Sequence, residues 1–128
     1  MLSPTAVFSG FSVSDMEKTK EFYGTTLGFK VESDPKGLHI ELPGGGQVFV
    51  YQKDNHEPAS FTILNIVVAN IDSAVDELLK LGVTFERYEN MPQDERGIAR
   101  GLAANMGPDI AWFKDPAGNI LAILQDAK

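Results

Sequence analysis

Two polar side chains, His39 and Glu41, lie two positions apart in the segment GLHIEL (residues 37–42), which alternates apolar and polar residues. This alternation is typical of a strand, and side chains two apart on a strand point to the same face. The carboxylate could then orient the imidazole, which would act as a general base or bind a ligand hydroxyl. Polar residues at this spacing are equally typical of the solvent-facing side of an open sheet, so both interpretations remain.

Aromatic residues form a second group that could take part in binding. Phe49 and Tyr51 lie two apart in one apolar segment, and Trp112, the one tryptophan of the chain, lies in another. Aromatic faces stack on flat rings and attract cations, so each of the three could contact an organic ligand. Packing in the core is the commoner role of such residues and stays open for all three.

A long aperiodic stretch, residues 91–108, combines arginines and acidic residues with Gly, Ala and Met. Loops longer than about 12 residues are usually functional or mobile. Small residues and methionines suit an adaptable lid over a ligand, and Arg100 is then the residue expected to bind a ligand carboxylate. The alternative is a surface insertion with ordinary charge.

The composition limits the classes of function. The chain has 128 residues, a net charge of −7 and no cysteine, so disulfides, thiolate catalysis and sulfur-ligated metals are excluded and a cytoplasmic location is expected. An acidic chain without a Lys/Arg cluster is unsuited to nucleic acid, whose phosphates need positive charge. No apolar run approaches the roughly 18 residues of a membrane span, and no signal peptide is visible. The acidity favours either a cationic ligand or simple solubility.

An internal repeat sets the expected architecture. Residues 11–31 are echoed by residues 66–86, and each copy reads as a strand, a capped amphipathic helix, a glycine turn and another strand. In the first copy, Ser14 and Glu17 have the spacing of a capping box, and Gly28 is expected to end the helix.

The remaining helix, turns and strands are predicted from the spacing of apolar residues and from residues typical of turns. In the second copy, Asn70 or Asp72 is expected to cap a helix that runs to Leu81, with Val75, Leu78 and Leu79 on its buried side. The Gly-rich segment 43–46 is read as a hairpin turn, and His56 as a surface residue of a polar linker (53–60). Strands are expected at residues 6–13, 29–32, 37–42, 47–52, 61–68, 83–88, 109–114 and 119–125.

These elements predict an α+β fold made of two tandem βαβββ modules in a single domain (1–128). Module one covers residues 1–55 and module two residues 60–128. Together they are expected to form a curved, eight-stranded mixed sheet with helices on the convex face. The free concave face would suit a small molecule.

The chain resembles the vicinal oxygen chelate superfamily, which includes glyoxalase I, extradiol dioxygenases, and fosfomycin- and bleomycin-resistance proteins. The resemblance rests on SVSDMEKTKEFYGTTLGFKV, VANIDSAVDELLKLGVTF and WFKDPAGNILAIL, in that order. It covers nearly the whole chain and implies the paired βαβββ fold and, commonly, a homodimer.

Enzymes of this family bind a divalent metal through the first and last strands of each module. The resemblance carries these four positions to Phe8, Ile63, Ala122 and the pair Phe49/Val50. None of these side chains has the oxygen or nitrogen donors that a divalent cation needs, so no metal and no other cofactor is expected.

The leading hypothesis is a metal-free small-molecule binding protein that acts as a homodimer and holds an organic, aromatic or cationic ligand in the concave cleft. One alternative is a metal-dependent lyase, isomerase or dioxygenase, and another is an acid–base enzyme that uses His39 and Glu41; a module for protein interaction is a third. The residues expected to line the cleft are Phe8, Ser12, His39, Glu41, Phe49, Tyr51, Ile63, Asn65, Arg100, Trp112 and Ala122.

Overall fold

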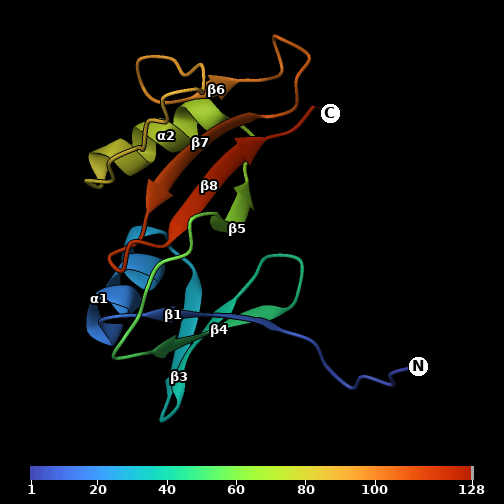
Figure 1. Cartoon of the computed structure of the whole chain (residues 1–128), viewed down its shortest axis with the longest axis vertical. Coiled ribbons are helices and arrows are strands. Elements are labelled where there is room, and N and C mark those ends of the chain that lie inside the picture. The colour runs from blue at the N-terminus through green and yellow to red at the C-terminus, as the bar shows by residue number, and fades with distance from the viewer. Residues whose placement is uncertain (128) are drawn as a thin grey trace. The chain divides into compact units, whose positions relative to one another are not determined.

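The computed structural model describes residues 1–127. The chain divides into two compact units, Met1–Pro58 (unit 1) and Ala59–Lys128 (unit 2), and each is described by itself (Figure 1).

Unit 1 is a βαβββ module with one mixed, four-stranded sheet in the order β1-β4-β3-β2. Strands β1 and β4 are parallel, whereas β3 is antiparallel to both β4 and β2. Its elements are β1 (Ser9–Val13), α1 (Met16–Lys20), the π-helical turn η1 (Glu21–Thr26), β2 (Lys30–Asp34), β3 (Gly37–Glu41) and β4 (Gln47–Gln52).

The helix of unit 1 begins one residue later than the capping box predicts. The N-cap is Asp15, whose carboxylate accepts the Lys18 amide at 3.1 Å, so Ser14 is not the cap. The helix continues directly into η1, where Tyr23 is fully buried. Gly28 has a φ of 77° and ends this segment, as predicted, because only glycine adopts such a backbone without strain.

Alternation along β3 and β4 divides the sheet of unit 1 into two faces. Leu38 and Ile40 are fully buried on the side that α1 covers, as the alternation of residues 37–42 predicts, and Val50 is buried with them. The intervening side chains, His39 and Phe49 among them, lie on the opposite, open face.

Unit 2 repeats this architecture, with a four-stranded sheet in the order β5-β8-β7-β6. The helix α2 packs on β7 and β8. Its elements are β5 (Thr62–Val67), α2 (Ile71–Lys80), β6 (Ala99–Arg100), β7 (Asp109–Lys114) and β8 (Ile120–Gln125).

The prediction of a strand at residues 83–88 is wrong. Only an isolated bridge joins Phe85 to Phe113, and the edge position is taken by β6, which lies within the stretch that was expected to be a loop. The reason is a side chain: Gln93 accepts the Tyr88 amide at 2.8 Å and donates to the Glu86 carbonyl at 2.9 Å. These backbone groups therefore need no neighbouring strand.

The helix of unit 2 follows the sequence closely. Asn70 is the N-cap and accepts the Ser73 amide at 3.0 Å. Val75 and Leu78 are buried as predicted, but Leu79 is 43% exposed, and Ile71 is the third buried residue of the helix.

The predicted α+β fold of two βαβββ modules is therefore confirmed. Within residues 1–127, no helix is both long enough and apolar enough to cross a membrane.

Candidate functional site

The open face of unit 1 carries a short aromatic row. In the sheet register, Gly10, Phe49 and His39 are neighbours across three strands, and Ser12 lies opposite Tyr51. The ring centroids of His39 and Phe49 are 5.2 Å apart, and those of Phe49 and Tyr51 are 6.1 Å apart. Five of the residues expected from the sequence thus share one face, because Glu41 also belongs to it by alternation.

His39 is held by two partners, neither of which is Glu41. Its Nε2 atom donates to Asp34 Oδ2 at 2.5 Å and its Nδ1 atom to Gln47 Oε1 at 2.8 Å. Glu41 instead lies 3.4 Å from the Lys30 ammonium, so of the two interpretations of this pair the one in which Glu41 orients His39 does not hold. The hydrogen bond to Asp34, followed by that to Gln47, raises the pKa of His39, because both acceptors favour a doubly protonated ring. The same bond lowers the pKa of Asp34.

His56 does more than the sequence predicts. Its Nδ1 atom lies 2.6 Å from Ser12 Oγ, and the ring is half-buried, so it is not simply a surface side chain. Ser12 and His56 are 44 positions apart, so no local sequence pattern predicts their pairing. Phe8, on the same predicted face as Ser12, is 64% exposed.

Unit 2 contains an apolar cavity of about 610 Å³. Pockets for drug-sized ligands range from about 300 to 1,000 Å³, so the cavity has the size of such a site. Most of its wall comes from the segment 91–108 and the rest from β7. The lining residues are Met91, Pro92, Gln93, Asp94, Ile98, Ala99, Arg100, Gly101, Ala104, Met106, Pro108, Ile110 and Trp112.

Strand β7 supplies the aromatic part of the wall by alternation. Ala111 and Phe113 are fully buried, whereas Ile110 and Trp112 point to the other face and line the cavity. The Trp112 ring packs edge-on against Tyr88, with centroids 5.5 Å apart. Burial raises the pKa of Tyr88.

The sheet register brings three of the expected residues together in unit 2. Asn65, Ala122 and Trp112 are direct neighbours across β5, β8 and β7. Ala122 is fully buried, and only Trp112 of this row lines the cavity. Ile63 lies where the register between β5 and β8 shifts.

Arg100 reaches the cavity wall, but its guanidinium binds carboxylates of the chain itself. It lies 2.7 Å from Asp72, 3.1 Å from Asp94 and 3.5 Å from Asp109. The hydrogen bond to Asp72 is the main cause that raises the pKa of Arg100, and the same bond lowers the pKa of Asp72. The residue expected to meet a ligand carboxylate thus ties the segment 91–108 to α2.

A second arginine strengthens this attachment. Arg96 pairs with Asp72 and lies 2.5 Å from Asp76, both on α2. The chain can also turn back tightly after β6, because Gly101 has no side chain: a Cβ there would lie 2.3 Å from the Pro108 carbonyl oxygen. Salt bridges and close backbone packing therefore give the wall a fixed shape.

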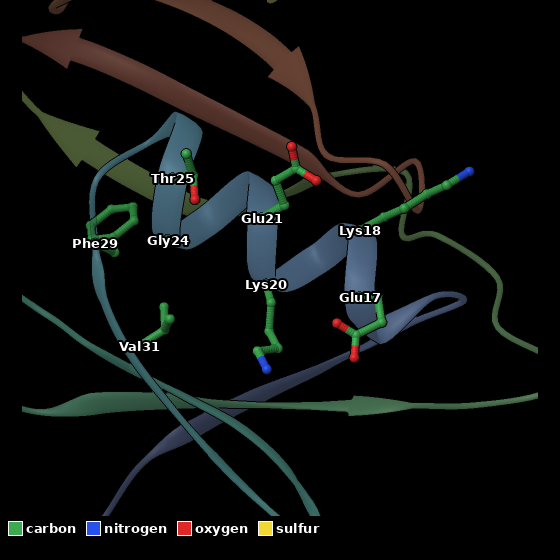
Figure 2. Close-up of a pocket in the computed structure, with 8 residues that line it drawn as sticks. All are labelled: Glu17, Lys18, Lys20, Glu21, Gly24, Thr25, Phe29 and Val31. Carbon is green, nitrogen blue, oxygen red and sulfur yellow. The ribbon is translucent and has the colours of Figure 1, made fainter.

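Unit 1 has a hollow of about 660 Å³ beside α1 and η1, but its chemistry is different (Figure 2). Figure 2 shows Glu17, Lys18, Lys20 and Glu21 pointing in different directions, with Phe29 and Val31 as its larger apolar side chains. Charges that do not converge on one point offer no common site for a ligand. The unit 2 cavity is the better candidate.

Comparison with known proteins gives a consistent picture. The family model described as "Glyoxalase/Bleomycin resistance protein/Dioxygenase superfamily" matches residues 6–123. Among curated proteins, no match to the chain is found.

Several solved structures share the fold. A superfamily member from Sphaerobacter thermophilus DSM 20745 is 27% identical, with a TM-score of 0.65 and coverage of 94% of this chain and 98% of that one. TnmS3, an antibiotic binding protein from Streptomyces sp. CB03234, is 24% identical, with a TM-score of 0.66 and coverage of 98% and 100%. A putative glyoxalase family protein from Bacillus anthracis is 18% identical, with a TM-score of 0.68 and coverage of 99% and 100%.

Proposed function

The chain belongs to the glyoxalase/bleomycin resistance protein/dioxygenase superfamily, and from this premise we propose that it is a metal-free protein that binds a small organic molecule in the cavity of unit 2. The observation that carries the proposal is the cavity itself: about 610 Å³, walled mainly by apolar side chains, with Trp112 in its lining. That combination of volume and apolar lining is typical of small-molecule sites.

The metal that the family implies does not suit the residues present. The matching positions are Phe8, Phe49 or Val50, Ile63 and Ala122, and carbon side chains cannot coordinate a divalent cation. Among residues 1–127, no three His, Cys, Asp or Glu side chains are grouped to hold a metal ion. We therefore derive no step through a metal.

The segment 91–108 supports binding in a second way. Met91 and Met106 contribute flexible, polarizable side chains that adapt to ligands of different shape. The fold is compatible with this role, since TnmS3, which shares it, is an antibiotic binding protein.

Acid–base catalysis by His39 has weaker support. A general base needs a nitrogen that can reach the substrate, and both ring nitrogens of His39 are already hydrogen-bonded, Nε2 with Asp34 and Nδ1 with Gln47. Glu41, the other expected participant, pairs with Lys30. Metal-dependent lyase, isomerase or dioxygenase chemistry would need ligands other than the four matching positions.

A ligand screen tests the proposed function. We expect a panel of small aromatic compounds to include members that raise the melting temperature and bind by calorimetry. The binding should weaken in Ile110→Glu, which places a charge on the cavity wall, and persist in Tyr51→Ala on the open face of unit 1. Retained binding in Ile110→Glu together with loss in Tyr51→Ala would contradict the assignment to unit 2, and a panel without a binder would contradict the function.

We propose, in addition, that the protein is a cytoplasmic homodimer, as the family resemblance and the lack of cysteine suggest. Sedimentation equilibrium should give twice the 14.0 kDa mass of the chain, and cell fractionation should place the protein in the cytosol. A monomer throughout the concentration range, or recovery outside the cytosol, would contradict this proposal.

A further inference from the structure

Besides the indole of Trp112, whose N–H can donate one hydrogen bond, the lining of the unit 2 cavity has three polar side chains, Gln93, Asp94 and Arg100. What each of them binds decides which ligands the wall can recognise. A wall built for a polar or charged ligand would present donors or acceptors that lack a partner within the protein.

Gln93 has used both of its donors. Its Nε2 atom donates to the carbonyls of Glu86 at 2.9 Å and Gly97 at 2.7 Å. Its Oε1 atom accepts the Tyr88 amide at 2.8 Å. A primary amide has two N–H donors, so none is left for a ligand.

Asp94 is similarly engaged. Its Oδ1 atom accepts the backbone amides of Arg96 and Ile98, each at 2.9 Å, and its Oδ2 atom accepts Arg100 Nε at 3.2 Å. Burial raises the pKa of Asp94, but these three donors outweigh it and lower the pKa overall. The carboxylate thus stays ionised as part of the protein's own framework.

Arg100 faces three carboxylates of the chain itself. Besides Asp94, its guanidinium binds both carboxylate oxygens of Asp72, at 2.7 and 3.2 Å, and Asp109 Oδ2 at 3.5 Å. Its donors therefore face carboxylates of the chain, and the positive charge is neutralised before any ligand arrives. Across residues 1–127, no buried side-chain nitrogen or oxygen lacks a hydrogen-bond partner.

We infer that the ligand of this cavity is an uncharged, mainly apolar molecule with a flat ring, an inference that rests on the proposed function. The remaining lining consists of Ile, Met, Pro, Ala and Gly with the indole of Trp112, which recognises rings and hydrocarbon and not charge. The net charge of −7 does not select a cation here, because surface charge is screened within about 8 Å at physiological salt.

Three probes with the same ring system test this inference: anthracene-9-methanol (neutral), 9-anthracenecarboxylate (anionic) and 9-(aminomethyl)anthracene (cationic at neutral pH). Calorimetry on the full chain should show the neutral probe binding at least about tenfold more tightly than either ion. Its affinity should change less than about twofold between about 50 and about 500 mM NaCl, since no ion pair forms.

A matched pair of variants locates the effect. Ala104 lines the cavity and is exposed, so Ala104→Glu adds an unpaired charge to the wall without disturbing the core. We expect this variant to bind the cationic probe more tightly, in a salt-dependent way, and the neutral probe more weakly. Ala103 is also exposed but lies outside the lining, and Ala103→Glu should behave like the wild type.

The outcomes separate this inference from the proposed function. Tighter, salt-dependent binding of either charged probe to the wild type would overturn the inference and leave small-molecule binding intact. Equal responses of Ala103→Glu and Ala104→Glu would overturn the location in the cavity. If none of the three probes binds while the wider panel of small aromatic compounds contains a binder, the inference falls and the proposed function stands; the proposed function falls only if that panel contains no binder either.

Discussion

The two modules share one strand order, and their clearest difference lies in one connection. In unit 1, β2 and β3 are joined by a tight turn in which Asp34 accepts the amides of Lys36 and Gly37. In unit 2, the corresponding part of the chain lengthens into the segment 91–108, whose short strand β6 pairs with β7. The tight turn of unit 1 leaves one face of its sheet open, whereas the segment 91–108 of unit 2 forms most of the wall of a cavity.

This difference gives unit 2 an apolar cavity that is walled mainly by the segment 91–108. The strands and helix provide the same scaffold in both units, whereas the inserted segment provides the apolar wall. The salt bridges of Arg96 and Arg100 hold that wall on α2. The comparison predicts that changes to the segment 91–108 alter binding and stability, and that matched changes on the open face of unit 1 do not alter binding.

The largest effect is expected from Ile98→Ala. Ile98 is fully buried although it lies in the inserted segment, so removing its side chain should lower the free energy of unfolding by about 2 to 4 kcal/mol. Met106, in the same segment, is 82% exposed, and Met106→Ala should change the free energy of unfolding by less than about 0.5 kcal/mol. Urea unfolding measures both. Near-zero loss for Ile98→Ala would mean that the segment is not an ordered part of unit 2.

The next effect concerns ligand affinity. Trp112→Ala removes the indole from the cavity wall and should weaken binding of an aromatic ligand by about tenfold to a hundredfold. Tyr51→Ala removes an aromatic side chain from the open face of unit 1 and should leave the affinity unchanged. Calorimetry compares them directly, and the opposite ranking would assign the ligand to unit 1.

Asp72→Asn should have a smaller effect on stability. Asp72 binds both Arg96 and Arg100, but its side chain is 49% exposed, so solvent screening limits the loss to about 1 kcal/mol. Asp76→Asn loses one partner only and should cost less. Thermal unfolding at low and high salt checks this order, because salt should reduce both effects.

The smallest effect is a difference in pH dependence. The raised pKa of His39 makes its contribution to stability complete below the ordinary value of 6.5 and lost as the pH rises through the folded-state pKa. The lowered pKa values of Asp72 and Asp94 act in the other direction, since their contribution is present above 3.8 and lost as the pH falls. The free energy of unfolding of His39→Gln should therefore lack the decrease that the wild type shows as the pH rises above 6.5. For Asp72→Asn, the pH dependence of the free energy of unfolding should differ from that of the wild type only in acid. Identical curves for all three proteins would contradict both assignments.

Local signals in the sequence predicted most of the fold. Apolar alternation located β3, β4, β7 and β8, and Gly28 ended the helical segment of unit 1 as expected. The internal repeat predicted the second module from the first. These signals work because period, caps and left-handed glycines are properties of neighbouring residues.

The errors arose where a hydrogen bond of a polar side chain, and not the spacing of apolar residues, decides the local structure. The strand expected at 83–88 fails because Gln93 binds the backbone of residues 86 and 88. His39 pairs with Asp34 and not with Glu41, because a turn returns Asp34 to the same face. The long segment 91–108 was expected to be either a lid or a surface insertion, and its β6 pairing and the three partners of Arg100 depend on tertiary contacts.

The most direct test of the binding site uses the four methionines. Met91 and Met106 line the cavity of unit 2, whereas Met1 and Met16 lie in unit 1 and outside that cavity. In a methyl NMR titration with anthracene-9-methanol, the signals of Met91 and Met106 should shift in a saturable way while those of Met1 and Met16 stay in place. A saturable shift of Met16 with Met91 and Met106 unmoved would contradict the account.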